Sequence, residues 1–259
     1  MSNEYTCHEP LQSVERTFTI LELLAKKPQG LYLTEISEKV GLSSSTVHRL
    51  LHSLMSLRYV LNRKESGGKY KLSYKLYELG TKYVAGQPFI QAAFPFLEKL
   101  SSNIFRAVSL YVPELFDVVS VARTGNGREK ATGHLPALRV PMYACSAGIA
   151  ILSTYDNERI EALWENSKVM PLTPCTMKTL GRLYARVESA RERGYDLSQD
   201  EYRMGVSNMA VAIVPRGKTA IGAIQCVYPS SEGQSAVLKD SATLLETAKA
   251  LADLYSGVL

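Results

Sequence analysis

Apolar residues recur at helical spacing in the first quarter of the chain. Residues 44–57 carry a stripe at i, i+3, i+4, i+7 and i+10, which predicts a helix buried along one side. The stripe consists of Val47, Leu50, Leu51, Leu54 and Leu57. Residues 33–40 are predicted as a shorter helix, Gly41-Leu42-Ser43 as the turn between the two, and residues 13–25 as a first helix.

A hairpin is predicted directly after these helices. Residues 59–61 and 69–72 read as short strands, and Gly67-Gly68 supplies the positive φ that a tight return needs. The order helix, helix, helix, hairpin predicts a winged helix-turn-helix domain over residues 1–72. The base of such a hairpin completes the small core, while its tip faces a phosphate backbone or a minor groove.

The helix predicted over residues 44–57 is polar on the side opposite its apolar stripe. On this side Arg49 is suited to fork onto guanine O6 and N7 or onto a phosphate. The helix and the hairpin together carry the candidate DNA contacts, which are Ser44, Ser45, Thr46, His48, Arg49, His52, Arg63, Lys64 and Lys69. His48 lies at the margin of the stripe, so packing against the core is its alternative role.

The distribution of charge along the chain supports the interpretation of these residues as DNA contacts. From Lys39 to Lys64 there is no Asp or Glu, whereas five Lys and Arg fall in the segment. Residues 1–87 hold 12 Lys and Arg against eight Asp and Glu, so most of the net charge of +5 belongs to the first third. A solvated basic surface or a protein-binding module would carry similar charge. Turn, helix and charge together favour double-stranded DNA as the partner.

Helix-like and strand-like segments alternate in the rest of the chain. Residues 73–87 are predicted as a connecting helix that ends near Pro88, and residues 88–259 as a second domain. In this domain helices are predicted over 90–103, 146–155, 157–167, 178–193 and 236–255, and strands over 107–111, 118–123, 138–143, 209–214 and 220–228. Strands at hairpin separation among flanking helices predict an α+β fold with a largely antiparallel sheet.

Composition narrows the class of protein. With 259 residues, 46% hydrophobic and 21% charged, the chain is ordinary globular material with room for two domains. No apolar run approaches the roughly 20 residues that cross a bilayer, and residues 1–10 lack a signal-peptide core. A cytoplasmic protein without a membrane partner is expected. The four cysteines show no CxxC spacing, so no metal site or disulfide framework is expected, and Cys145 and Cys226 are predicted as core residues.

The placement of histidine disfavours an enzyme. Of the four His residues only His134 lies beyond Pro88, so Ser/His/Asp or metal chemistry would lack its usual base and ligands. No catalytic residue and no cofactor are predicted. The alternative is a small-molecule-processing enzyme with a fused winged-helix module, since carboxylate chemistry remains open.

Several separated motifs occur in order along almost the whole chain. In the first domain they are Ser13-Val14-Glu15-Arg16, Gly41-Leu42, Ser45-Thr46-Val47-His48-Arg49-Leu50-Leu51, and Tyr70-Lys71-Leu72 followed by Leu79-Gly80. In the second they are Val140-Pro141-Met142-Tyr143-Ala144 with Ala147-Gly148, Arg193-Gly194-Tyr195, and Asp200-Glu201 followed by Gly205-Val206. Together they resemble the IclR family of bacterial transcriptional regulators. The family often has Pro and Lys where Ser43 and Ser44 stand here, and Ser43 is expected to cap the helix instead.

The resemblance implies a GAF-like effector-binding domain, with a small-molecule site over the open face of its sheet, and a homodimer or dimer of dimers on operator DNA. The candidate effector contacts are Arg128, Glu129, Tyr143, Ser146, Ala147, Asn208 and Gln225. Residues 143–147 lead into a helix whose free N–H groups favour a carboxylate, which indicates a small organic or aromatic acid. Gln225 interrupts an apolar strand and needs a partner.

These contacts have alternative roles. Ser146 is expected as a helix cap whether or not it touches ligand. Gln225 could face solvent on an edge strand instead of the pocket. Arg128 and Glu129 could pair with each other at the surface.

Overall fold

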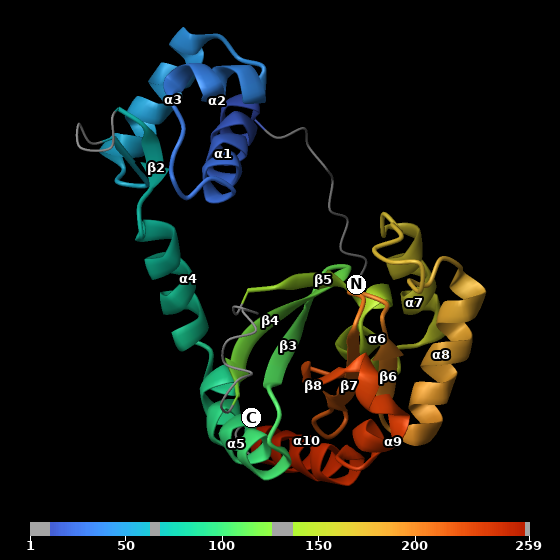
Figure 1. The fold of residues 1–259 in the computed structure, drawn as a ribbon. Helices are drawn as coiled ribbons and strands as arrows, with labels where there is room; N and C mark the ends of the chain where they lie inside the picture. The colour runs from blue at the N-terminus through green and yellow to red at the C-terminus, as the bar shows by residue number, and fades with distance from the viewer. Residues whose placement is uncertain (1–10, 63–67, 126–136, 257–259) are drawn as a thin grey trace. The chain divides into compact units, whose positions relative to one another are not determined.

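The computed structural model describes residues 11–62, 68–125 and 137–256, and it divides into two compact units (Figure 1). The first unit comprises Met1–Tyr83 and the second Val84–Leu259. The division falls inside helix α4 (Lys75–Ala85), within the segment predicted as a connecting helix.

Three helices and a two-stranded hairpin form the first unit. Its elements are α1 (Gln12–Ala25), α2 (Leu33–Val40), α3 (Ser44–Ser56), β1 (Val60–Asn62) and β2 (Tyr70–Leu72). The strands are antiparallel, with Val60 opposite Leu72. The helices and the hairpin bury one apolar cluster, whose most enclosed members include Ile20, Leu24, Ile36, Val47, Leu51 and Val60. The fold is the predicted winged helix-turn-helix.

The turn between α2 and α3 follows from its sequence. Gly41 ends α2 with a left-handed φ of 66°, a conformation that glycine adopts without steric cost. Ser43 begins α3 as its N-cap, and its Oγ accepts the Thr46 N–H at 3.3 Å, as expected. The apolar stripe is buried at Val47, Leu51 and Leu54, whereas Leu57 is exposed because α3 ends one residue before it.

The second unit is built on a six-stranded sheet with the order β5-β4-β3-β8-β7-β6, in which every neighbouring pair is antiparallel. The strands are β3 (Val108–Glu114), β4 (Asp117–Thr124), β5 (Arg139–Pro141), β6 (Asp196–Gln199), β7 (Val206–Ile213) and β8 (Gly222–Pro229). The helices are α5 (Pro88–Ile104), η3 (Met142–Ala144), α6 (Ser146–Leu152), α7 (Asn157–Glu165), α8 (Leu180–Arg193), η4 (Ser230–Glu232), α9 (Gly233–Leu238) and α10 (Ser241–Ser256). The predicted α+β class with an antiparallel sheet is confirmed.

Each face of this sheet buries its own apolar cluster. Helices α5 and α10 cover one face, where Leu97 and Leu251 pack against Val108 and Ile224 (Figure 1). Helix α6 covers the other face over β7 and β8. The close approach of α6 to the preceding turn requires Gly148, since a Cβ there would lie 2.2 Å from the Met142 carbonyl oxygen.

The second unit departs from the prediction in three places. The strand predicted over 138–143 is only three residues long and passes into η3. The closing helix is two helices, α9 and α10, divided at Asp240, whose carboxylate accepts the Tyr228 hydroxyl at 3.0 Å. Strand β6 was not predicted, because its inward residues Asp196 and Ser198 are polar and give no apolar alternation.

Candidate DNA-binding face and effector pocket

One side of α3 presents polar and cationic side chains to solvent. Ser44, Ser45, His48, Arg49 and His52 are all exposed on this helix, so His48 does not pack into the core. Thr46 is half-buried instead, and its hydroxyl lies 2.9 Å from the capping Ser43 hydroxyl. The exposed residues of α3 therefore form a surface without any carboxylate of its own, which is called the α3 face below.

The base of the hairpin adds positive charge to the same unit. The Lys69 ammonium lies 5.0 Å from the centre of the Tyr32 ring, a cation–π distance. Lys75 donates to the Leu57 carbonyl at 2.9 Å and lies over the Tyr59 ring, so it fixes the turn after α3. The predicted contacts Arg63 and Lys64 lie outside the described residues.

A hollow of about 420 Å³, a volume that includes open solvent at its mouth, lies on the α6 side of the sheet. Its lining residues are Tyr111, Arg123, Leu138, Val140, Cys145, Tyr202, Arg203, Val206, Asn208, Gln225 and Val227. The described lining includes two arginines, two tyrosines and several aliphatic side chains, and no Asp or Glu. A lining of this chemistry suits a small anion with an apolar body. We call it the effector hollow.

Four of the predicted effector contacts lie together and hydrogen-bond to one another or to shared partners. Gln225 Oε1 accepts the Ala147 N–H at 3.1 Å, and Gln225 Nε2 donates to Asn208 Oδ1 at 3.4 Å. Asn208 Nδ2 in turn donates to Ser198 Oγ at 3.2 Å, which also accepts the Ser146 hydroxyl at 2.8 Å. Asn208 and Gln225 line the effector hollow, whereas Ser146 and Ala147 are absent from its lining. Gln225 is only 5% exposed, on a central strand rather than an edge.

Two further predicted contacts take other roles. Ser146 is the first residue of α6 and not its cap; the cap is Cys145, whose Sγ accepts the Gly148 N–H. Tyr143 lies away from the effector hollow, where its hydroxyl accepts the Met170 N–H at 2.8 Å and its ring packs edge-on against Trp164. Arg128 and Glu129 lie outside the described residues.

A buried ion cluster, unforeseen from the sequence, borders the hydrogen-bonded group. Arg186 of α8 binds Asp196 through two nitrogens, at 2.8 and 2.6 Å, and also pairs with Glu201. Asp196 is fully buried and Arg186 14% exposed. Burial raises the pKa of Asp196 and of Glu201, and the guanidinium between them opposes that rise. The same guanidinium donates to the Leu197 carbonyl, so it also satisfies part of the outer edge of β6.

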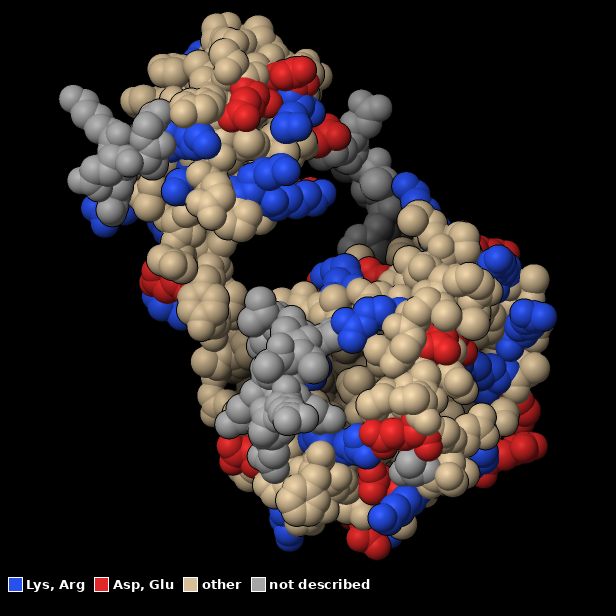
Figure 2. All heavy atoms as spheres, in the orientation of Figure 1, with Lys and Arg blue, Asp and Glu red and all other residues tan. Residues whose placement is uncertain are grey.

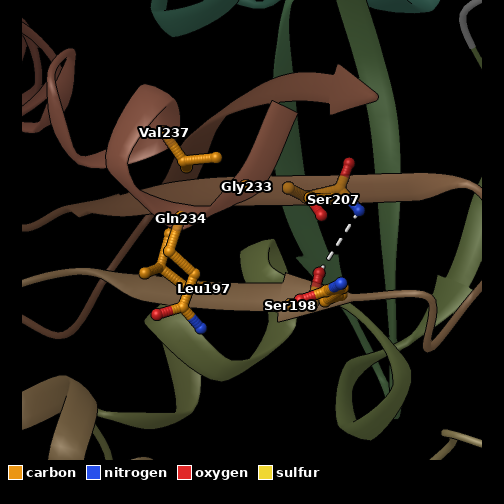
Figure 3. Close-up of a pocket in the computed structure, with 8 residues that line it drawn as sticks. Leu197, Ser198, Ser207, Gly233, Gln234 and Val237 are labelled. Carbon is orange, nitrogen blue, oxygen red and sulfur yellow. Dashed lines mark hydrogen bonds between the residues drawn. The ribbon is translucent and has the colours of Figure 1, made fainter. Parts of the chain in front are cut away.

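A second hollow of about 320 Å³, open solvent included, lies at the β6 edge of the sheet. Figure 3 shows Val237 and Gln234 of α9 above Leu197 and Ser198 of β6, with the hydrogen bond between Asn208 and Ser198 among the residues drawn. Among the residues that the structure describes, those lining this second hollow are all uncharged. The effector hollow therefore offers the stronger anchor for an ionic ligand.

The other residues missed from the sequence are those that surround the hollow. Tyr111 and Arg123 come from β3 and β4, and Tyr202 and Arg203 from the turn between β6 and β7. The alternation of side chains along β3 could have placed Tyr111 on the α6 side of the sheet. The position of Arg123 could not be predicted in this way, because the bulge at Leu110/Tyr111 shifts the register between β3 and β4. Within the described residues, no cluster of three or more His, Cys, Asp or Glu side chains could hold a metal, and no helix has the length and apolarity of a membrane span.

A winged helix with a polar α3 face, joined in one chain to a domain with a hollowed antiparallel sheet, defines a class of transcriptional regulators that bind DNA and a ligand in separate domains. Sequence models agree with this class. The IclR helix-turn-helix domain matches residues 13–63, and the bacterial transcriptional regulator IclR C-terminal domain matches residues 81–254. The chain belongs to the IclR family and is a DNA-binding transcriptional regulator, not an enzyme.

Individual relatives extend over nearly the whole chain. The HTH-type transcriptional regulator XynR of Escherichia coli is 30% identical over 245 residues, which is 92% of this chain and 94% of XynR. A regulator from Rhodococcus sp. RHA1 has the same fold, with a TM-score of 0.78, 24% identity and coverage of 93% and 97% of the two chains. An IclR homologue from Microbacterium hydrocarbonoxydans, solved with 4-hydroxybenzoate, gives a TM-score of 0.74 at 20% identity, covering 93% and 98%.

Proposed function

We propose that the α3 face reads operator DNA in the major groove. The observation that supports this most directly is the exposure of Arg49, His48 and His52 on a helix that carries no acidic residue. An operator duplex would attract this surface through its phosphates and present base edges to its side chains. Lys69, and Arg63 and Lys64 in the hairpin, are proposed to contact the backbone beside it.

Replacement of Arg49 tests this assignment. If Arg49 contacts a base, Arg49→Ala should weaken binding to the DNA upstream of the gene by about 1–3 kcal/mol. If it contacts a phosphate, the slope of log affinity against log salt concentration should fall by about one. Arg182→Ala removes another exposed arginine, from α8, and is the matched control. Affinity and salt slope would be measured by fluorescence anisotropy at several salt concentrations. Equal operator affinity of the two variants would contradict the assignment of the α3 face as the DNA-binding surface.

We also propose that the regulator is a homodimer, or a dimer of dimers, held in part by α4 and α1. None of the residues of α4 is buried, and several of them are large and hydrophobic. Tyr77 is 72% exposed, and Leu76, Leu79 and Tyr83 are exposed as well. Figure 2 shows mainly uncharged surface along this helix. On α1, Phe18 is 56% exposed. A second copy would cover these groups and place two α3 faces about 34 Å apart, the spacing of successive major grooves.

Light scattering on two variants separates this dimer from other assemblies. Tyr77→Glu should shift the protein towards smaller species, because a charge would be buried in the contact. Leu115→Asp changes an exposed apolar residue in the second unit and should leave this contact intact. Equal masses for wild type and Tyr77→Glu would exclude α4 from the interface.

For the second unit, we propose that a small organic acid binds in the effector hollow and changes operator affinity. The absence of Asp and Glu from its described lining, with Arg123 and Arg203 present, supports an anion. The 4-hydroxybenzoate complex of the Microbacterium homologue supports an acid with an aromatic body. Helix α4 would carry the change to the α3 face.

A thermal-shift screen of carboxylic acids against the full chain tests the effector. A bound acid stabilises the folded protein by mass action, and the same acid should change operator affinity. Amides of the same skeletons are the control for charge. A screen in which amides stabilise as well as acids would contradict an anionic effector.

A further inference from the structure

We propose that Arg203, in the turn between β6 and β7, binds the effector's carboxylate at the mouth of the effector hollow, while the apolar body of the acid lies inward beside Tyr202. This inference rests on the proposed role of the hollow as the effector site. It assigns an orientation to the ligand and names Arg203 as the residue that sets the preference for an acid.

The buried polar side chains of the hollow are already bonded to one another. Gln225 Oε1 accepts the Ala147 N–H, and Gln225 Nε2 donates to Asn208 Oδ1. A hydrogen bond also links the Gln225 amide to the Tyr111 hydroxyl. Asn208 Nδ2 donates to Ser198 Oγ, and every buried side-chain nitrogen and oxygen among the described residues has a partner. A carboxylate at this inner end would have to displace one of these acceptors, which is costly in a buried network.

Of the two arginines in the described lining, Arg203 is the one available to a ligand. Arg123 already interacts with another group of the protein. Arg203 forms no hydrogen bond or ion pair with any other described residue; its charge acts on the neighbouring Tyr202, where it opposes the rise in pKa that burial causes. Arg203 is exposed although it lines the hollow, so it lies where the hollow opens to solvent.

The turn that carries Arg203 is held on both sides by hydrogen bonds. Asp200 has a left-handed φ of 59°, and its carboxylate accepts the Gly205 N–H at 2.6 Å, which closes the turn. The Glu201 carbonyl accepts the Thr176 hydroxyl at 2.6 Å, so the other strand of the turn is tied to the segment before α8. Binding therefore has to order the Arg203 side chain but not its backbone, which lowers the entropic cost of the contact.

The remaining walls of the hollow indicate the class of ligand. They are aliphatic or aromatic side chains, namely Leu138, Val140, Val206, Val227 and the half-buried Tyr202. Such walls suit an apolar body, and with the inner polar groups already paired they offer nothing to a second charge. The expected effector is a monocarboxylate whose body is a single aromatic ring, with its charged group directed outward.

Titration calorimetry on the full chain tests this orientation with three probes. Benzoate, its neutral isostere benzamide, and the dicarboxylate terephthalate would be titrated into wild type, Arg203→Gln, Arg203→Lys and the control Arg182→Gln. Arg182 is another exposed arginine of the second unit and lies outside the hollow's lining. Thermal midpoints without ligand report whether each variant is folded.

Wild type and the control should prefer benzoate to benzamide, and Arg203→Gln should lose about three- to tenfold in benzoate affinity together with that preference. Arg203→Lys should recover part of the loss, because it keeps the charge but not the two-pronged donor. Added salt should weaken benzoate binding to wild type more than to Arg203→Gln, since an exposed cation is screened. Terephthalate should bind wild type about tenfold more weakly than benzoate, or less tightly still.

The contrary outcomes are distinct. Arg203→Gln that binds benzoate as tightly as wild type, or terephthalate that binds as tightly as benzoate, would place a charge at the inner end and overturn the proposal. If wild type does not bind benzoate but another acid of the screen alters operator affinity, the ligand class is wrong while the proposed regulator stands. If no acid binds and operator affinity never changes, the proposed effector function itself fails.

Discussion

The polar side chains of α3 are exposed to solvent, whereas those beneath α6 are buried in the protein. On α3, Arg49 and His52 point into water and depend on the protein only for the position of their helix. Beneath α6, Ser146, Asn208 and Gln225 are buried and hold one another through hydrogen bonds. An exposed polar face is satisfied by solvent until a partner replaces it, whereas a buried group must carry its partners within the fold.

The two regions should therefore respond to substitution in opposite ways. A change on the α3 face should remove a proposed contact with DNA but leave no buried group without a partner, so that operator affinity falls while stability is kept. A change in the buried group leaves its neighbour unsatisfied, at a cost of about 1–3 kcal/mol per hydrogen bond and more for a charge. The proposed effector site in the second unit is thus lined by groups that also hold its core together.

The largest effect is expected at Arg186. Arg186→Met leaves the buried Asp196 and the nearly buried Glu201 facing one another without a cation, and should lower the free energy of unfolding by about 3–5 kcal/mol at pH 7. Urea denaturation followed by Trp164 measures this selectively, because Trp164 is the single tryptophan of the chain and lies in the second unit. Glu78→Gln, in the exposed Glu78–Lys82 pair, should leave the midpoint unchanged.

The loss at Arg186 should depend on pH with a definite sign. Burial raises the pKa of Asp196 and Glu201 above that of the unfolded chain, and removal of the guanidinium raises both further. A carboxyl group with a raised folded pKa destabilises as pH increases above its unfolded pKa, near 4. The deficit of Arg186→Met should therefore shrink as pH falls from 7 towards 4. A deficit that grows on acidification would contradict the buried cluster.

A smaller effect is expected at the cap of α3. Ser43→Ala removes the oxygen that accepts the Thr46 N–H and should cost about 1 kcal/mol of helix stability. Amide hydrogen exchange should then quicken in the first turn of α3. The substitution should also weaken operator binding slightly. Ser53→Ala is the matched control in the same helix, since its hydroxyl only returns to the Arg49 carbonyl and alanine is the better helix former. Equal exchange in both variants would mean that the cap does not hold α3.

The first unit was predicted closely because its signals are local. Gly41, Ser43 and the spacing of Val47, Leu51 and Leu54 each act within one or two helical turns, and the observed α2 and α3 follow them to within a residue. In the second unit the same reasoning found most helices and strands. It failed at β6, where the inward Asp196 is paired by Arg186 from another element. A charge that is satisfied across the fold leaves no pattern along the chain.

The candidate effector pocket was predicted only where a residue was unusual in its own strand. Gln225 and Asn208 stand out because they are polar beside apolar runs, and both line the effector hollow. Arg123 and Tyr202 look ordinary in sequence, and they meet only through strand register and the turn after β6. Long-range pairing of this kind is fixed by the assembled sheet and not by spacing along the chain.

The smallest effect is expected in a chemical-labelling experiment, which compares an exposed thiol with a buried thiol of the second unit. Burial raises the pKa of Cys145 to about 12, and its sulfur also caps α6, whereas Cys175 is exposed. At pH 8 almost none of Cys145 would be ionised, and the thiolate is the species that alkylates. Iodoacetamide at pH 8 should therefore label Cys175 rapidly and spare Cys145 and the buried Cys226, as read by peptide mass spectrometry. Denaturant should make all three react alike. Labelling of native Cys145 at the rate of Cys175 would show that the core beneath the effector hollow opens to solvent, and the contrast between the two polar regions would then lose its basis.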